Sequence, residues 1–222
     1  MKDYDYRKHK RLIDFILKWR IPLISSSLSA KVYDEEYYAE GNEWKEPSCK
    51  KVAEILNEFF SFSSVFDIGC GVGLYLEQLH ILGKETLGCD SSEAAVGMAP
   101  ESITVYQADA TKPIKVNRRF DLVICFEVAE HIQGRYSLQL VRNCVHQGDI
   151  VCFTAAPKGQ GGIGHINEQP YQFWINLFSR HGFRYEDTLS KKIRIRMKDE
   201  QVVSWIAENL LVFKEKTSII TK

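Results

Sequence analysis

Residues 67–74 read DIGCGVGL and directly follow the short apolar run SVF. Glycine stands at every second position of this stretch, at Gly69, Gly71 and Gly73. Glycines that follow a buried strand let the backbone turn tightly and approach a ligand closely, and the helix after the turn offers its free amide groups. The stretch therefore predicts a buried parallel strand, then a ligand-binding turn, then a helix.

On the C-terminal side of this turn, short apolar runs alternate with segments of helical periodicity. The predicted strands cover residues 64–69, 85–90, 103–109, 120–128, 149–157, 182–186 and 209–216. The predicted helices include residues 47–60, 137–144 and 170–181, and residues 188–208 are predicted as a helical insertion. Strands that alternate with helices indicate a parallel sheet covered on both faces. We expect an α/β fold with a Rossmann-like, seven-stranded, mostly parallel sheet, helices on both faces and one antiparallel edge strand.

The chain has the length and composition of one globular domain. We expect that domain at residues 31–222, preceded by a basic helical extension at residues 1–30 that contains the break SSSLS. Lysine plus arginine equals aspartate plus glutamate, with 29 of each, so no overall field attracts nucleic acid or an anionic membrane. The apolar stretch at residues 12–24 is interrupted by charges and a proline, and we expect no membrane span.

Local features add two expectations about location and partners. The six cysteines are scattered and form no CxxC pair, which predicts buried free thiols in a cytoplasmic protein. The basic clusters Arg7–Arg11 and Lys191–Lys198 leave RNA open as a partner, although a run such as the second is usually a solvated helix face.

The glycine loop does not fit a dinucleotide. A dinucleotide fingerprint spaces its glycines GxGxxG, but position 74 is leucine. Asp67 places an anion inside the loop, which would repel a diphosphate and suits a cationic ligand. Methyl donors of the adenosylmethionine type carry an ammonium and a sulfonium group. The loop resembles motif I of class I methyltransferases, and the resemblance implies S-adenosyl-L-methionine as the cofactor.

Acidic side chains stand at the ends of the next three predicted strands. Asp90 ends the second strand, where its carboxylate can accept both ribose hydroxyls. Asp109 ends the third strand next to Ala110, where the resemblance implies a contact with the adenine amine. The predicted cofactor-binding residues are Asp67, Gly69, Cys70, Gly71, Gly73, Asp90, Ser91, Asp109, Ala110, Phe126 and Glu127. The alternative is that each acid only caps the turn or helix after its strand.

The segment EVAEH at residues 127–131 adds chemistry to the end of the fourth strand. If the segment is helical, its spacing places Glu127, Glu130 and His131 on one face. The loop after the fifth strand carries His165 and opens at the same edge of a parallel sheet. We expect Glu130, His131 and His165 to be catalytic, with a histidine as general base. Glu127, Glu130, His131 and His165 are also a candidate set of ligands for Mg²⁺ or Mn²⁺.

EVAEH followed by a later histidine is similar to two groups of methyltransferases. Quinone-biosynthesis O-methyltransferases carry an EVxEH segment at this place, and small-RNA 2′-O-methyltransferases pair such a segment with a later histidine. Both likenesses imply a metal that binds and acidifies a hydroxyl. We expect a S-adenosylmethionine-dependent methyltransferase that acts on an oxygen, or else a nitrogen, of a small or medium acceptor. The alternatives are a metal-assisted RNA 2′-O-methyltransferase and a non-catalytic S-adenosylmethionine-binding module.

Two groups of aromatic residues have different interpretations. The first group either covers the cofactor as a lid or packs against the first helix of the domain. Its members are Tyr33, Tyr37, Tyr38 and Trp44. Trp174 and Phe178 repeat at helical spacing, which indicates core packing.

Overall fold

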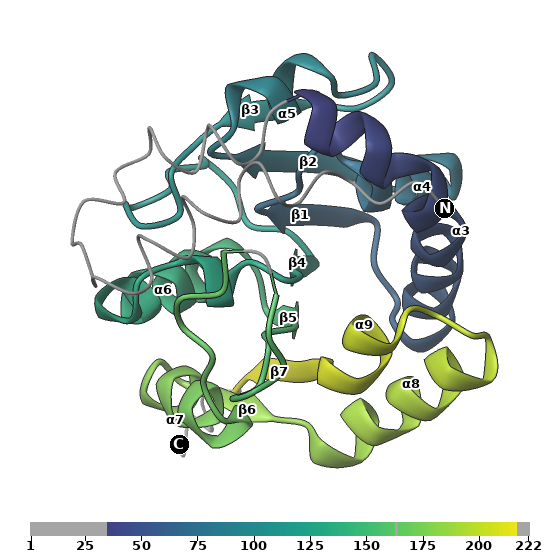
Figure 1. The fold of residues 1–222 in the computed structure, drawn as a ribbon. Coiled ribbons are helices and arrows are strands. Elements are labelled where there is room, and N and C mark those ends of the chain that lie inside the picture. Colours follow the sequence, from purple (N-terminus) through teal and green to yellow (C-terminus); the bar gives the residue numbers. More distant parts are fainter. Residues whose placement is uncertain (1–34, 163, 217–222) are drawn as a thin grey trace.

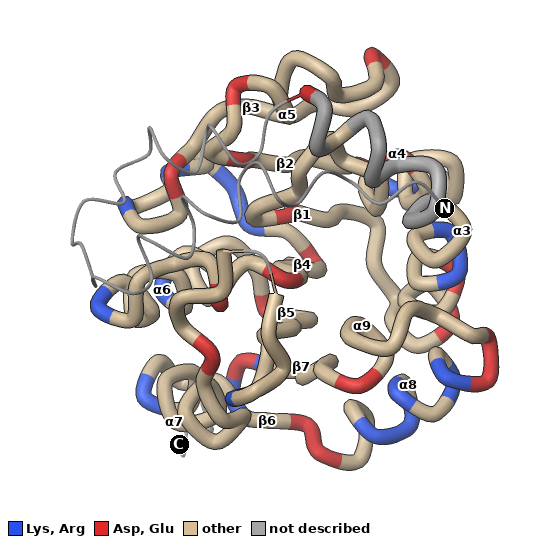
Figure 2. Tube along the Cα trace, viewed as in Figure 1, with Lys and Arg blue, Asp and Glu red and all other residues tan. Residues whose placement is uncertain are grey.

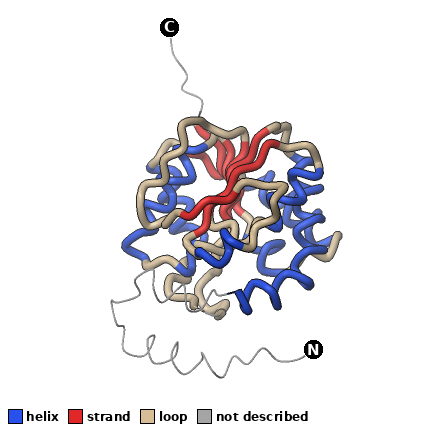
Figure 3. The backbone as a smooth tube through the Cα atoms, turned by 90° about the horizontal axis from the view of Figure 1, so that it is seen from above, coloured by secondary structure: helices blue, strands red, loops and turns tan. Residues whose placement is uncertain are grey.

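The computed structural model describes residues 35–162 and 164–216 (Figure 1). The predicted N-terminal extension at residues 1–30, with its basic cluster Arg7–Arg11, lies outside the described residues. Within the described part, a central sheet is covered by helices on both faces (Figure 3). This layered arrangement is the one that alternating strands and helices predict.

Seven strands form one sheet in the order β3-β2-β1-β4-β5-β7-β6. The strands are β1 (Ser64–Ile68), β2 (Glu85–Asp90), β3 (Val105–Gln107), β4 (Leu122–Cys125), β5 (Ile150–Phe153), β6 (Phe183–Tyr185) and β7 (Leu211–Glu215). The pairs among β1 to β5 are parallel, and β7 is antiparallel to both of its neighbours. The predicted Rossmann-like, mostly parallel sheet is confirmed, and the antiparallel strand β7 inserts between β5 and the edge strand β6.

The strand order creates a place for a ligand. The chain runs outward from β1 through β2 to β3, and then returns to build β4 and β5 on the other side of β1 (Figure 1). Because these five strands are parallel, their carboxyl ends meet at one edge. In open α/β sheets, ligands bind at this edge, where the strand order reverses.

Strand residues alternate between two buried clusters, one on each face of the sheet. The helices are α3 (Glu35–Phe59), α4 (Leu74–Ile81), α5 (Glu93–Gly97), α6 (Ser137–Gln147), α7 (Tyr171–Arg180), α8 (Asp187–Asp199) and α9 (Ser204–Asn209). Val65 packs in the cluster that α3, α4, α8 and α9 cover, whereas Phe66 packs in the cluster of α6 and α7. Trp174 and Phe178 are fully buried, which confirms that they belong to the core.

The observed elements differ from the predicted ones mainly at their ends. The predicted strands at 103–109 and 120–128 are shorter at both ends in the structure, and the residues that follow them form loops of the ligand edge. The predicted helix start at Pro47 is wrong: α3 begins at Glu35 and passes through this proline. A proline inside a helix removes one backbone hydrogen bond, and the helix continues on either side of it.

The basic cluster Lys191–Lys198 forms most of α8, as the predicted helical insertion requires. Its cations follow one another along the helix, and acids of the same chain lie at both ends of it (Figure 2). The ion pairs join Lys191 to Asp187, Arg196 to Glu58 and Lys198 to Glu208, at N···O distances of 2.7, 3.2 and 3.2 Å. These ion pairs lie on the solvent-facing side of α8, where acidic side chains offset the positive charge of their partners.

All six cysteines are free thiols, and five of them are buried, as predicted. Across residues 35–162 and 164–216, no helix has both the length and the apolarity to cross a membrane.

Candidate functional site

The glycine loop after β1 has a backbone that only glycine adopts easily. Gly69, Gly71 and Gly73 have φ angles of 76°, 56° and 86°. A Cβ atom on Gly69 would lie 2.4 Å from Cγ2 of Val128, and one on Gly73 would lie 2.3 Å from Cδ1 of Ile103. The amides of Gly69 and Cys70 both donate to the carbonyl of Cys89, which ties the loop to β2. The loop therefore needs glycine both for its φ angles and for its close packing.

Asp90, at the end of β2, holds this loop from the side. Its Oδ2 accepts the amide of Gly71 and its Oδ1 accepts the amide of Ser92, both at 2.8 Å. Burial raises the pKa of Asp90, while the hydrogen bonds from these amides oppose that shift. A carboxylate has about four acceptor positions, so Asp90 keeps capacity for a ligand while it organises the loop. Ser91 is exposed beside it.

Asp67 lies inside β1 and is almost completely buried, with 2% of its surface exposed. Among the residues that the structure describes, its Oδ2 has no hydrogen-bond partner. Burial, and then the negative charge of Asp90, raises the pKa of Asp67 well above its usual value. A buried carboxyl oxygen without a partner is costly, and a cationic group in the loop would relieve that cost.

Asp109 follows β3 and organises its own turn. Its Oδ1 accepts the amide and the hydroxyl of Thr111 at 2.9 and 2.6 Å, and its Oδ2 lies 3.3 Å from Nζ of Lys112. Partial burial raises the pKa of Asp109, but these hydrogen bonds and the lysine charge outweigh it, so the pKa is lowered overall. These are the contacts expected of an acid that only caps the turn after its strand, which is the alternative to a cofactor contact. Ala110, next to it, accepts a hydrogen bond from Asn143 at 2.9 Å.

The end of β4 contains a residue in a rare backbone conformation. Glu127 has a φ of 55°, although it is not glycine, and its amide donates to Oγ1 of Thr154 at 2.8 Å. Such conformations cost energy and concentrate at functional sites. The preceding Phe126 is buried and packs edge-to-face on Tyr75 of α4. Only Ala129–His131 are helical in EVAEH, so Glu127 reaches the site from the turn before the helix rather than from its face.

Glu130 is completely buried at the start of the loop after β4. Neither of its carboxyl oxygens has a hydrogen-bond partner within the described part of the chain. Burial, and then the charge of Glu127, raises the pKa of Glu130 to about 9. Its backbone carbonyl accepts the amides of Ile166 and Asn167 at 2.8 and 3.0 Å, which joins it to the loop after β5.

The two histidines lie against each other at this junction. The rings of His131 and His165 are 5.0 Å apart between centroids and meet edge to face at 80°. Potential ligand atoms of Glu130, His131 and His165 all lie within 4.8 Å of one another. Glu127 is not part of this set of three, although its charge acts on Glu130.

Three polar residues that sequence analysis did not single out support this junction. Asn167 is buried and donates to the carbonyl of Ala129 and to Oγ of Ser137, at 3.1 and 3.0 Å. Glu168 lies 3.1 Å from Nδ1 of His165. Asn209, at the end of α9, donates to Oε1 of Gln160 at 2.9 Å. The only available signal was proximity in sequence, since Asn167 and Glu168 directly follow the segment that contains His165.

One aromatic side chain of the predicted lid can be placed. Tyr38 of α3 lies over the glycine loop, because a Cβ atom on Gly71 would be 3.3 Å from its Cε1. Tyr33 and the side chains of Tyr37 and Trp44 lie outside the described residues.

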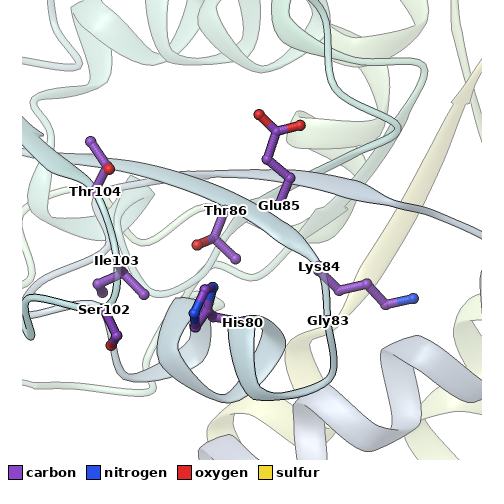
Figure 4. Close-up of a pocket in the computed structure, with 8 residues that line it drawn as sticks. All are labelled: His80, Gly83, Lys84, Glu85, Thr86, Ser102, Ile103 and Thr104. Carbon is purple, nitrogen blue, oxygen red and sulfur yellow. The ribbon is translucent and has the colours of Figure 1, made fainter.

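A surface pocket of about 520 Å³ lies elsewhere in the fold. Its lining comprises His80, Gly83, Lys84, Glu85, Thr86, Ser102, Ile103 and Thr104 (Figure 4). Glu85 begins β2 whereas Asp90 ends it, so this pocket lies at the opposite edge of the sheet from the glycine loop. It is separate from the site that the strand-end residues form.

Comparison with known proteins agrees with the geometry of this site. Residues 38–145 match the family described as a methyltransferase domain. The chain is 35% identical over 166 residues to a ubiquinone biosynthesis O-methyltransferase of Bradyrhizobium diazoefficiens, covering 70% of this chain and 61% of the relative. It is 38% identical over 127 residues to the enzyme of the same name from Burkholderia lata, covering 54% of this chain and 50% of that one. The chain thus spans only 50 to 61% of the length of these two curated relatives.

Solved structures share the fold at low sequence identity. The sugar N-methyltransferase KedS8 from Streptoalloteichus superposes with a TM-score of 0.61 at 15% identity, covering 81% of this chain and 91% of that one. The magnesium protoporphyrin IX methyltransferase of Synechocystis, solved with bound S-adenosylhomocysteine, superposes with a TM-score of 0.53 at 19% identity, covering 63% of this chain and 74% of that one. In its matched methyltransferase domain, its strand order and its glycine loop, the chain is similar to class I S-adenosylmethionine-dependent methyltransferases.

Proposed function

We propose that this protein transfers a methyl group from S-adenosylmethionine to an oxygen of a small or medium-sized acceptor. The observation that carries the proposal is the pairing of two half-sites at one sheet edge. One is Asp67 beside the glycine loop, whose buried Oδ2 has no partner among the described residues, and the other is the junction of Glu130 with His131 and His165. The name O-methyltransferase that the curated relatives carry supports oxygen as the acceptor atom.

The residues around the glycine loop fit the methyl donor. Asp67 offers the donor's ammonium its buried Oδ2, which has no partner among the described residues, and the loop from Gly69 to Gly73 would contact the donor's amino-acid part through its backbone. Asp90 has acceptor capacity left for the ribose hydroxyls. Cys70, Ser91, Asp109, Ala110, Phe126 and Glu127 complete the predicted donor site.

The donor supplies a methyl group whose bond to sulfur breaks, with both electrons staying on sulfur, as the bond to the acceptor oxygen forms. For that displacement the protein has to align the acceptor and exclude water. The acceptor also has to lose its hydroxyl proton, and an imidazole nitrogen of His131 or His165 accepts it. Because a phenol has a pKa near 10, far closer to that of imidazole than an aliphatic alcohol has, a phenolic hydroxyl is the acceptor class that this base serves best.

Turnover with catechol as the phenolic probe tests this proposal. We expect S-adenosylhomocysteine and a methyl ether to form, detected by mass spectrometry. His131→Ala and His165→Ala should each lower kcat about 100-fold, while calorimetry shows nearly unchanged affinity for S-adenosylhomocysteine. Donor binding without turnover on phenols, alcohols or amines would identify a non-catalytic module, and no donor binding would contradict the proposal as a whole.

A metal-assisted version of the same reaction is the second candidate. It rests on the cluster of Glu130, His131 and His165, a mixed oxygen and nitrogen set that suits Mg²⁺ or Mn²⁺. When bound there, the ion would lower the pKa of the acceptor hydroxyl. Loss of turnover in EDTA, with recovery on adding Mg²⁺ or Mn²⁺, would support this version. Full turnover in EDTA would leave the histidines as the base.

RNA receives no support as the acceptor. In the described basic cluster on α8, Lys191, Arg196 and Lys198 pair with acids of the same chain, and no RNA-modifying enzyme is among the relatives described above. A small-molecule acceptor is therefore proposed.

A further inference from the structure

Glu168 makes three contacts that all lie within the loop after β5. Its Oε2 accepts the amide of Gly159 at 2.8 Å, and its Oε1 accepts the amide of Gly161 at 2.6 Å. The same Oε1 lies 3.1 Å from Nδ1 of His165. One carboxylate thus binds the backbone of the glycine-rich segment and the imidazole that follows it.

The contact with Glu168 determines which nitrogen of His165 carries the proton. Both oxygens of the Glu168 carboxylate already accept backbone amides, as those of an ionised carboxylate do. An ionised carboxylate can only accept hydrogen bonds. Nδ1 of neutral His165 therefore holds the hydrogen, and Nε2 carries the lone pair.

The surroundings of the ring keep His165 in this orientation. A Cβ atom on Gly162 would lie 2.3 Å from Nε2 and 2.5 Å from Cε1, so the imidazole rests directly on the bare Cα of this glycine. His131 meets the ring edge to face, and its own Nδ1 lies 3.3 Å from the carbonyl oxygen of Gly164. Both imidazoles thus direct Nδ1 at the loop.

The loop itself is anchored at two further points. Asn209 of α9 donates to Gln160 at its tip and accepts the hydroxyl of Tyr171 at 2.7 Å. Asn167 binds Ala129 and Ser137 beside the other histidine. These anchors hold the glycine-rich segment in place, so the carboxylate of Glu168 meets His165 in a defined geometry.

We propose that Glu168 is a positioning residue of this site, which fixes His165 in the tautomer with Nε2 unprotonated and holds the glycine-rich loop around it. This inference rests on the proposed function, since a base that receives the acceptor proton needs a free lone pair at Nε2. A metal ligand at the same nitrogen has the same requirement, and carboxylates commonly orient such histidines.

The tautomer can be measured without any acceptor. We would record the imidazole ¹⁵N–¹H correlation spectrum of the full chain at pH 8 in EDTA, with His165 assigned by a His165→Gln variant. We expect the pattern of a protonated Nδ1 and an unprotonated Nε2 in the wild-type protein. A wild-type His165 with its proton on Nε2 would overturn the inference, whatever the variants do.

Glu168→Gln tests the cause, with the exposed Glu101→Gln as matched control. We expect Glu168→Gln to shift His165 toward the Nε2–H tautomer and to lower kcat with catechol about 10- to 100-fold, with unchanged affinity for S-adenosylhomocysteine. Glu101→Gln should change neither. An unchanged spectrum in Glu168→Gln would contradict the inference. A tautomer shift in a protein that methylates nothing would support the positioning of His165 and contradict the proposed function.

Discussion

The amide of Gly71 donates a 2.8 Å hydrogen bond to Oδ2 of Asp90, so the glycine loop after β1 and the acid that ends β2 form one unit. Asp90 therefore has two tasks in the proposed site. It holds the backbone of the loop in place, and it offers its remaining acceptor positions to the donor's ribose.

Replacing Asp90 should weaken donor binding. We expect Asp90→Ala to lower the affinity for S-adenosylhomocysteine by about 1.5 to 3 kcal/mol, because two ribose hydroxyls lose a charged acceptor and the loop loses its tie. Isothermal titration calorimetry measures the change. Asp149→Ala, which removes an exposed acid from the other edge of the sheet, is the control. Equal affinity in wild type and Asp90→Ala would disprove the ribose role.

The close contact of the loop with Val128 can be separated from the cost of a positive φ angle. Gly69 and Gly83 have φ angles of 76° and 78°, but a Cβ atom meets Val128 at 2.4 Å in the first and nothing within 4 Å in the second. We expect Gly83→Ala to lower the free energy of unfolding by about 1 to 2 kcal/mol. Gly69→Ala should cost about 1 to 3 kcal/mol more, because the valine has to move. Urea denaturation measures both, and equal costs would contradict the predicted clash.

The buried Glu130 should make stability fall as the pH rises. Its pKa is raised from 4.5 to about 9, so between these values the native protein holds a proton that the unfolded chain has released. The contribution of Glu130 is therefore most favourable below pH 4.5 and is lost progressively up to about pH 9. Glu130→Gln should remove this slope and stabilise the metal-free protein on the order of 2 kcal/mol at pH 8, with little effect at pH 5.

Urea unfolding in EDTA at pH 5, 6.5 and 8 gives the required comparison for Glu130→Gln. Glu101→Gln controls for the loss of one negative charge at an exposed position. Parallel pH profiles of wild type and Glu130→Gln would show that Glu130 is already ionised in the native state, against this prediction.

Removing the predicted N-terminal extension should leave the domain folded. Both buried clusters of the described structure are built from residues 52–213. We expect deletion of residues 1–30 to change the urea midpoint little and to leave S-adenosylhomocysteine affinity unchanged. A large fall in stability or loss of donor binding would show that the extension is part of the domain. Reduced turnover in a stable protein would instead assign the extension to the acceptor side.

The sheet and the places of the glycine loop, Asp67 and Asp90 in it could be predicted because their signals are local in sequence. Period-two and continuous apolar runs mark strands, and the glycines at 69, 71 and 73 mark a turn whatever lies around it. The positions of Asp67 and Asp90 follow from the strand ends, since parallel strands align their carboxyl ends at one edge. The ends of the elements were less predictable. Helix α3, for example, runs through Pro47, because the remaining interactions of the helix outweigh the one backbone hydrogen bond that a proline cannot make.

The cluster of Glu130, His131 and His165 depended on the tertiary structure. The sequence places His131 and His165 on successive loops, but their 5.0 Å ring contact and the burial of Glu130 arise from packing between those loops. The pKa of Glu130 near 9 has the same origin, because desolvation and the charge of Glu127 act only once the chain has folded. Likewise, no periodicity marks Glu168 as the partner of His165: that contact exists because the glycine-rich loop turns back on itself and leaves one carboxylate within reach of two amides and an imidazole.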